Sequence, residues 1–335
     1  MPDLQSSSSS FSPSSSTPRA GVRALALCLL LSAMVLSGEE GAEPVLTLEG
    51  HMSLIGGLAF TPDGRTLISA GSYVDATICF WDAASGELRH SIQGEKGSVA
   101  CLALSPDGKT LAVGGGDATL RLLDAASGKT LRELPKHRGG VNAVAFSRDG
   151  KLLASACDGD EAVRVWDLAS GAVLQAFTIR WGAHAVAFEP HGKVLAGGGR
   201  FGRLLLWGAT SGNLLATLLS SEGKVTVAWS PDGAYLANGS AAPVLHLWDA
   251  KGRKLLRSLP AGVPSAALAF SPDSRLLASA GKDNTVKLWS TRTGDLRASL
   301  KGHKGAISAL AFAPDGKTLA SGSEDRTINL WEVGK

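Results

Sequence analysis

Seven short apolar segments of this chain end in tryptophan, or once in leucine, at intervals of 41 to 43 residues. The closing positions are Trp81, Leu123, Trp166, Trp207, Trp248, Trp289 and Trp331. A turn signal precedes each of them, such as Ser-Pro-Asp-Gly at residues 105–108 and 230–233. A fixed period of this length indicates one supersecondary unit that is copied along the chain. The period therefore predicts a repeat architecture with seven units.

A single repeat has the composition of a small antiparallel sheet. The last copy, residues 300–331, contains runs of four to seven residues separated by Gly, Asp and Pro, and three of the runs are rich in β-branched or aliphatic residues. No repeat shows the 3.6-residue period of a helix. The run 306–312 is apolar on both faces, so its sheet must be covered on both sides. We therefore expect an all-β, seven-bladed β-propeller of four-stranded antiparallel blades around a central channel.

The two ends of the repeat region indicate how the ring closes. Residues 45–51 have the sequence of an outer strand, whereas the chain stops just after Trp331, at the end of an inner strand. The last sheet therefore lacks one strand, and we expect the N-terminal strand to join it. This pairing would remove an exposed sheet edge.

The first 44 residues are expected to lie outside the propeller, which spans residues 45–335. Residues 1–18 are Ser-rich and too polar to bury a core, so they predict a disordered tail. Residues 19–37 combine two arginines with a 13-residue apolar run, which suits the n- and h-regions of a signal peptide. A membrane-spanning helix needs about 20 apolar residues. We therefore expect export to the periplasm or medium after cleavage, followed by a linker at 38–44, with membrane tethering by an uncleaved segment as the alternative.

Composition excludes several classes of function. The net charge is +3, with 33 basic and 30 acidic residues interspersed, so the chain lacks the electrostatic footprint of a nucleic-acid-binding protein. Cys79, Cys101 and Cys157 show no paired spacing and are expected to be buried free thiols. The histidines outside the repeat pattern show no metal-binding spacing. We expect a monomeric propeller with no metal, no cofactor and no stable membrane span.

Histidine, serine and aspartate recur together in three repeats. Such a set invites a catalytic interpretation, in which Asp orients His and His deprotonates Ser. A catalytic apparatus would appear once, whereas this set follows the repeat period. We therefore predict no catalytic residues. Each set also ends in Trp, and the members are His51, Ser69, Asp75, Trp81, His137, Ser155, Asp160, Trp166, His303, Ser321, Asp325 and Trp331.

These motifs resemble the WD-repeat β-propeller family, with seven repeats and of the exported bacterial type, over residues 45–335. The resemblance is carried by Gly-His at 50–51 and 302–303, the Ser-Pro-Asp-Gly turns, an Asp six residues before Trp, and terminal Trp-Asp pairs. It implies that the three sets form buried hydrogen-bond chains from Asp to His to hydroxyl to indole. Other repeats depart from the pattern, with Leu123 for Trp, Ala261 for His, and Phe201 and Ala242 for Asp.

The resemblance also implies which positions contact partners, because loops from all blades converge on one rim of the channel. Most of the corresponding residues are small, and few could serve as interface anchors. The fourth repeat is the exception, since it brings two aromatic residues, a histidine and an arginine into register. An alternative is that its aromatic residues only fill gaps in a degenerate blade. The predicted partner-binding residues are Trp181, His184, Arg200, Phe201, Lys282, Glu324, Asn142 and Leu54.

The sequence therefore predicts a non-enzymatic scaffold that binds a protein or peptide across the propeller rim. A propeller enzyme or small-ligand binder that uses the central channel is the alternative. Catalysis needs positioned acids, bases or a metal ion, and the inward positions of this chain are mostly Gly, Ala and Ser. A structural module of an envelope assembly is a third possibility.

Overall fold

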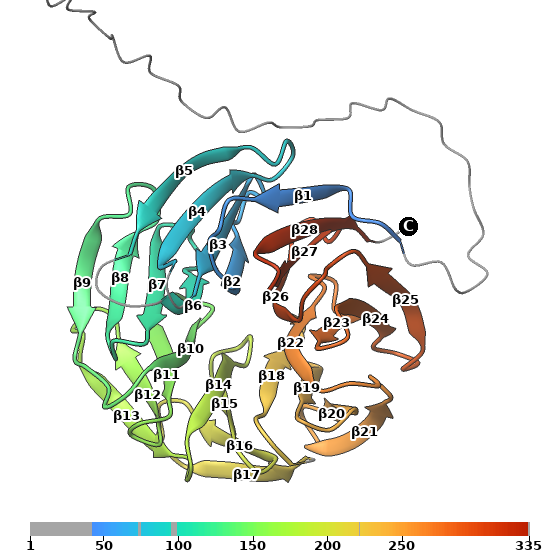
Figure 1. The fold of residues 1–335 in the computed structure, drawn as a ribbon. Coiled ribbons are helices and arrows are strands. Elements are labelled where there is room, and N and C mark those ends of the chain that lie inside the picture. The colour runs from blue at the N-terminus through green and yellow to red at the C-terminus, as the bar shows by residue number, and fades with distance from the viewer. Residues whose placement is uncertain (1–41, 73–74, 95–98, 221, 334–335) are drawn as a thin grey trace, which may run out of the picture. The chain divides into compact units, whose positions relative to one another are not determined.

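The computed structural model describes residues 42–72, 75–94, 99–220 and 222–333 (Figure 1), all within one compact unit that begins at Glu40. The predicted Ser-rich tail, the signal segment and linker residues 38–41 lie outside the described residues. Nowhere in the described ranges is there a helix with the length and hydropathy of a membrane span.

The described residues form seven four-stranded antiparallel sheets, the blades of a β-propeller. Blade one contains β2 (Ile55–Phe60), β3 (Thr66–Gly71), β4 (Thr77–Asp82) and β5 (Leu88–Gln93). Blade two contains β6 (Val99–Leu104), β7 (Thr110–Gly115), β8 (Leu120–Asp124) and β9 (Thr130–Leu134). Blade three contains β10 (Val141–Phe146), β11 (Leu152–Cys157), β12 (Ala162–Asp167) and β13 (Val173–Thr178). Blade four contains β14 (Ala183–Phe188), β15 (Val194–Gly199), β16 (Arg203–Gly208) and β17 (Leu214–Leu219).

The remaining blades follow the same order from the inner to the outer strand. Blade five contains β18 (Thr226–Trp229), β19 (Tyr235–Gly239), β20 (Leu245–Asp249) and β21 (Lys254–Leu259). Blade six contains β22 (Ser265–Phe270), β23 (Leu276–Gly281), β24 (Thr285–Ser290) and β25 (Leu296–Lys301). Blade seven contains β26 (Ile307–Phe312), β27 (Thr318–Ser323), β28 (Thr327–Glu332) and, as its outer strand, β1 (Leu46–Glu49). The predicted seven-bladed all-β fold is confirmed.

Closure of the ring by the N-terminal strand is also confirmed. In Figure 1 the blue β1 lies along the red β28. The two strands pair antiparallel, with Leu46 opposite Leu330 and Leu48 opposite Ile328. β28 therefore has a partner on each side.

The turns between the first two strands of a blade explain the recurrent Ser-Pro-Asp-Gly. In blade two the Ser105 hydroxyl donates to Asp107 (2.6 Å), and the same carboxylate accepts the backbone N–H of Lys109 (3.0 Å). Gly108 then takes a φ of 72°, which glycine adopts without a steric penalty. The turn motif of the sequence thus fixes the innermost hairpin of the blade.

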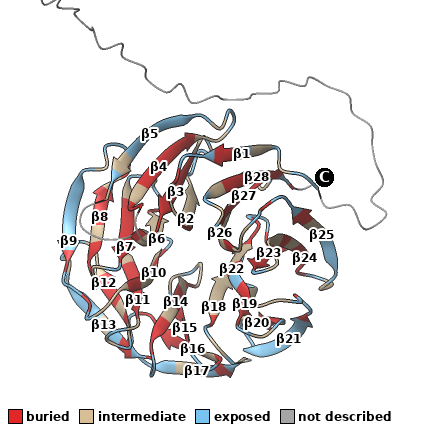
Figure 2. Cartoon of the chain, in the orientation of Figure 1, coloured by how far each residue is buried: buried red, intermediate tan, exposed pale blue. Residues whose placement is uncertain are grey.

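The core consists of separate apolar layers between neighbouring blades. The layer between blades six and seven, for example, joins Leu288 and Leu300 to Ile307, Leu319 and Trp331, all of them buried. Figure 2 shows this division: middle strands such as β3 and β4 are largely buried, whereas outer strands such as β5, β9 and β21 are largely exposed. Each sheet is apolar on both faces because each face packs against another blade.

Candidate functional site

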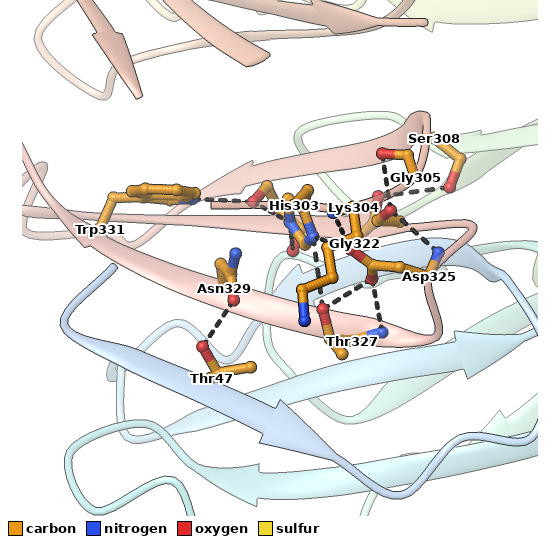
Figure 3. A network of polar contacts seen from close by, with 12 residues as sticks. Thr47, His303, Lys304, Gly305, Ser308, Gly322, Asp325, Thr327, Asn329 and Trp331 are labelled. Carbon is orange, nitrogen blue, oxygen red and sulfur yellow. Dashed lines mark hydrogen bonds and ion pairs between the residues drawn. The ribbon is translucent and has the colours of Figure 1, made fainter. Parts of the chain in front are cut away.

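Blade seven contains a buried chain of hydrogen bonds (Figure 3). His303 Nδ1 lies 2.9 Å from Asp325 Oδ2, and His303 Nε2 lies 2.8 Å from the Ser321 hydroxyl. The Trp331 indole N–H donates to the same hydroxyl at 2.7 Å. The chain connects the loop before β26, the turn after β27 and strand β28. It therefore ties together the three inner strands of the blade.

The Asp325 carboxylate has a donor on each oxygen. Oδ1 accepts the backbone N–H and the hydroxyl of Thr327 (2.9 and 2.7 Å), and Oδ2 also accepts the backbone N–H of Lys304 (2.7 Å). Burial alone would raise the pKa of Asp325, but these donors together with His303 lower it from 3.8 to about 2. The resulting stability is fully present above pH 3.8 and is lost as the pH falls through about 2.

Blades one and three contain the same chain. In blade one the His51–Asp75, His51–Ser69 and Trp81–Ser69 distances are 2.6, 2.7 and 2.7 Å. In blade three the His137–Asp160, His137–Ser155 and Trp166–Ser155 distances are 2.8, 2.7 and 2.9 Å. Burial lowers the pKa of His137 despite the nearby Asp160 carboxylate, so its imidazole is neutral at pH 7.

The three serines cannot act as nucleophiles in this arrangement. Ser69, Ser155 and Ser321 each have 0% exposure, so no substrate can reach their hydroxyls. Each hydroxyl also accepts an indole N–H. The geometry resembles a catalytic triad, but its effect is to satisfy buried polar groups.

Other blades replace members of the chain in physically matched ways. In blade two Val113 and Leu123 stand at the Ser and Trp positions, so both hydrogen-bonding partners are replaced by apolar groups, which costs little. In blade five the Asn238 side chain accepts the Trp248 indole N–H at 2.7 Å. In blade six Ala261 stands at the histidine position, and the Lys287 ammonium bonds to Asp283 (2.7 Å), as Arg164 bonds to Asp160 in blade three.

In blade four, apolar packing replaces every member of the hydrogen-bond chain. Ile179 and Gly197 lie 18 residues apart, which is the His-to-Ser separation in intact blades, and both are buried. The Trp207 ring packs against Gly197, where an added Cβ would lie 2.6 Å from Cζ3, and stacks on Phe177 with centroids 4.7 Å apart. In the intact blades an aspartate in the turn bonds to the histidine. Blade four has no histidine at the equivalent position, and Phe201 stands at the aspartate position.

Phe201 and Trp181 form an exposed aromatic pair on this blade. Phe201 is 59% exposed and Trp181 is 49% exposed, and their rings meet edge to face with centroids 5.3 Å apart. Both residues have left-handed backbone conformations, with φ of 57° and 67°. Bulky residues seldom adopt this conformation, and strain of this kind concentrates at binding sites.

Polar side chains surround the aromatic pair. The Arg203 guanidinium lies 5.4 Å from the Trp181 ring centroid, and Arg200 Nε donates to His184 Nε2 at 3.2 Å. Arg200 also lies 3.6 Å from the Asp158 carboxylate. Burial lowers the pKa of His184 to about 4, against the opposing effect of the nearby Asp158 carboxylate. A neutral imidazole at pH 7 can therefore accept the Arg200 hydrogen bond.

The structure brings together the four residues predicted for blade four, but not the other predicted contacts. Leu54, Lys282 and Glu324 lie on blades one, six and seven. The Asn142 amide donates to the backbone carbonyl of Ala183 (2.9 Å), so it links blade three to blade four. A partner-binding role for all eight predicted residues, four on blade four and four on other blades, stays a prediction.

Sequence reasoning missed Asp158 and Arg203, which complete the cluster. Asp158 lies in the turn of the neighbouring blade, so no local pattern connected it with Trp181. Gly182, next to Trp181 in the sequence, marks this approach: an added Cβ at Gly182 would lie 2.3 Å from Asp158 Oδ1. We call Trp181, His184, Arg200, Phe201 and Arg203 the blade-four rim.

A second cluster escaped the sequence search, which considered only close spacings between histidines. One ligand atom from each of His137, Cys157 and Asp160 lies within 4.8 Å of the others. Cys157 is buried and free, as are Cys79 and Cys101. Burial raises the pKa of the Cys157 thiol, which is therefore protonated at neutral pH.

Comparison with family models identifies the repeats. The model described as "WD domain, G-beta repeat" matches residues 42–82, 128–167, 212–249, 253–290 and 294–332, more than half of the chain. The model of the anaphase-promoting complex subunit 4 WD40 domain matches residues 91–144. Residues 168–211 lie outside both sets of matches, and they include the whole blade-four rim.

Curated relatives share shorter segments with the chain. It is 39% identical over 70 residues to an uncharacterized WD repeat-containing protein of Synechocystis sp., covering 21% of this chain and 20% of the relative. It is 40% identical over 78 residues to human coronin-7, covering 22% and 8%, and 34% identical over 67 residues to the transcriptional repressor rco-1 of Neurospora crassa, covering 20% and 11%. The matches thus span a fifth or less of each relative. The repeat period, the seven closed blades and the family match together show that this chain belongs to the WD-repeat family.

Proposed function

We propose that this chain is a non-enzymatic scaffold that binds a protein or peptide through the blade-four rim. The observation that carries the proposal is the exposed Trp181–Phe201 pair, held in two left-handed backbone conformations. Each such conformation costs on the order of 1–3 kcal/mol and persists where the surrounding structure enforces it. Packing alone does not explain it, because both rings keep about half of their surface in water.

The chemistry of the rim suits recognition of another polypeptide. Tryptophan, tyrosine and arginine carry much of the binding energy in protein interfaces, and the rim offers one tryptophan, one phenylalanine and two arginines. Intact hydrogen-bond chains in blades one, three and seven hold the rest of the ring in place. The blade-four rim, which lies outside the family-model matches, would present the docking surface of such a scaffold.

A double variant, Trp181→Ala with Phe201→Asn, is expected to weaken partner binding by at least about tenfold. Its unfolding free energy should stay within about 1 kcal/mol of the wild type, because the side chains are exposed and asparagine tolerates a positive φ. Partners captured on the immobilised full chain would be purified, and their Kd measured for both proteins. Met52→Ala is the matched control, since Met52 is apolar and 72% exposed on blade one. Equal affinity of the wild type and the double variant would eliminate the blade-four rim as the site.

We also propose that the protein is exported and is of the exported bacterial type. The apolar run at 24–36, preceded by Arg19 and Arg23, supports this proposal. Expression with its natural start should yield a mature protein shortened by about the first 37 residues in the periplasm or medium. Replacing Leu29 and Leu30 by arginine should abolish the shortening and retain the full-length chain inside the cell. A full-length wild-type chain recovered in a membrane fraction would favour tethering instead.

A further inference from the structure

In the hydrogen-bond chain of blade three, one acceptor has no hydrogen-bond donor. The equivalent acceptor of blade seven has one. The Asp160 side chain is only 7% exposed, and its Oδ1 is buried without a hydrogen-bond partner. In blade seven the residue two positions after the Asp is Thr327, which donates to Asp325 Oδ1. The residue at this place in blade three is Ala162, which has no hydroxyl. One carboxylate oxygen of blade three is therefore left without a donor.

The same blade places a thiol beside this carboxylate. Cys157 ends β11 and pairs with Val141, the first residue of the inner strand. The equivalent residues are Gly71 in blade one and Ser323 in blade seven. The Cys157 thiol donates to the Gly139 carbonyl (3.1 Å), as the Ser323 hydroxyl donates to Gly305. Among the three intact chains, only that of blade three combines a thiol with an orphaned carboxylate oxygen.

We propose that His137, Cys157 and Asp160 form a binding site for a divalent transition metal ion that favours thiolate and imidazole ligands, with Zn²⁺ as its representative. One donor atom of each residue lies within 4.8 Å of the other two. Tetrahedral zinc sites with N, S and O ligands hold their donors about 3.5 Å apart, so side-chain shifts of about an ångström complete the site. Three protein ligands leave the fourth position to water.

The neighbouring groups suit this role. Binding requires Cys157 to release its proton to solvent and the His137 ring proton to move from Nδ1 to Nε2. The Ser155 hydroxyl oxygen, 2.7 Å from Nε2, then accepts a hydrogen bond from the Nε2–H group and orients the ring. Arg164 holds Asp160 Oδ2 at 2.7 Å, which leaves Oδ1 for the metal. Blades one and seven offer glycine and serine instead of a thiolate, so we expect one ion per chain.

Titration of the reduced full chain with Co²⁺ tests this site. We expect one equivalent to bind with a thiolate-to-cobalt charge-transfer absorption, and Zn²⁺ to displace it and raise the Tm. Cys157→Ser and Cys157→Gly, which reproduce the residues of blades seven and one, should abolish the absorption and weaken binding at least about tenfold. Ala162→Thr should also weaken binding, because its hydroxyl would occupy Oδ1.

Matched measurements separate the site from other causes. Cys101→Ser should leave the absorption unchanged, because the Cys101 thiol donates to the carbonyls of Gly114 and Val141 and packs in an apolar layer with Leu120 and Val144. Circular dichroism and the metal-free Tm show whether each variant folds. Absence of the charge-transfer band in folded wild type, or the same Zn²⁺ affinity in folded Cys157→Ser, would overturn the proposal. Neither result bears on partner binding at the blade-four rim.

Discussion

Removal of residues 45–49 is expected to lower the free energy of unfolding by about 5 kcal/mol. These residues include β1, which is the fourth strand of blade seven. Leu48 is 3% exposed and belongs to the apolar layer between blades seven and one, against which Leu46 also packs. Burial of two such side chains stabilises by about 2 kcal/mol each at most, and the strand hydrogen bonds add to this.

The deletion would also expose groups that are now covered. Asn329 and Leu330 are 1% and 2% exposed beneath β1, and the Thr47 hydroxyl donates to the Asn329 side chain at 2.8 Å. Without β1, strand β28 becomes a free edge that can pair with another molecule. We therefore expect the truncated protein to aggregate at concentrations where the full chain stays monomeric.

Denaturant unfolding of the full chain and the truncated chain measures this effect. A matched pair of point variants tests the same strand without shortening it: Leu48→Ser should destabilise by about 2 kcal/mol, whereas Val45→Ser, at a position 63% exposed, should change little. Identical unfolding midpoints for the full and truncated chains would show that β1 does not close the ring.

His51→Ala is expected to destabilise the protein by about 3 kcal/mol. The side chains of His51 and Asp75 are 1% and 4% exposed, and His51 Nδ1 lies 2.6 Å from the Asp75 carboxylate. Removing the imidazole takes a side-chain hydrogen-bonding partner from a buried carboxylate. It also takes from Ser69 the ring nitrogen that lies 2.7 Å from its hydroxyl. Leaving a buried polar group without its hydrogen-bonding partner costs more than the hydrogen bond itself contributes.

His90→Ala in the same blade is the control for this measurement. His90 is exposed on the outer strand β5, where it stacks on Phe80 with ring centroids 4.3 Å apart. Its replacement should cost about 1 kcal/mol at most, because one stacked ring contact is lost while the imidazole itself is exposed. If the two alanine variants unfold at the same denaturant concentration, the hydrogen-bond chain of blade one does not stabilise its sheet.

The fold and its closure were predictable because they depend on patterns that repeat along the chain. The period, the turn residues and the incomplete last unit specify seven sheets and the strand that completes the seventh. The hydrogen-bond chains were predictable in blades one, three and seven, where all four residue types are present. Sequence could not show how the other blades compensate, because Lys287 reaches Asp283 from β24 in blade six, whereas Asn238 in blade five stands at the serine position itself.

Only some residues of the candidate site could be predicted from the sequence. Trp181 and Phe201 stood out as aromatic residues at positions where other repeats are small or acidic. Their exposure depends on the buried Ile179 and Gly197, which remove the usual partner of the turn residue. Asp158 reaches Arg200 from the neighbouring blade, so no spacing within one repeat encodes that contact. The His137–Cys157–Asp160 cluster lies within one repeat and was missed because Cys157 was treated apart from the histidine and aspartate.

The pairing of β1 with β28 also determines when the molecule can be completed during synthesis. Thr47 and Asn329, which bond to each other, are separated by 282 residues, so β1 cannot pair until β28 has been synthesised. Blades one to six can form as they emerge, but blade seven gains its outer strand only when β28 meets β1. Translation that stops early therefore yields a chain whose first strand has no partner, which leaves an unfinished product open to proteolysis.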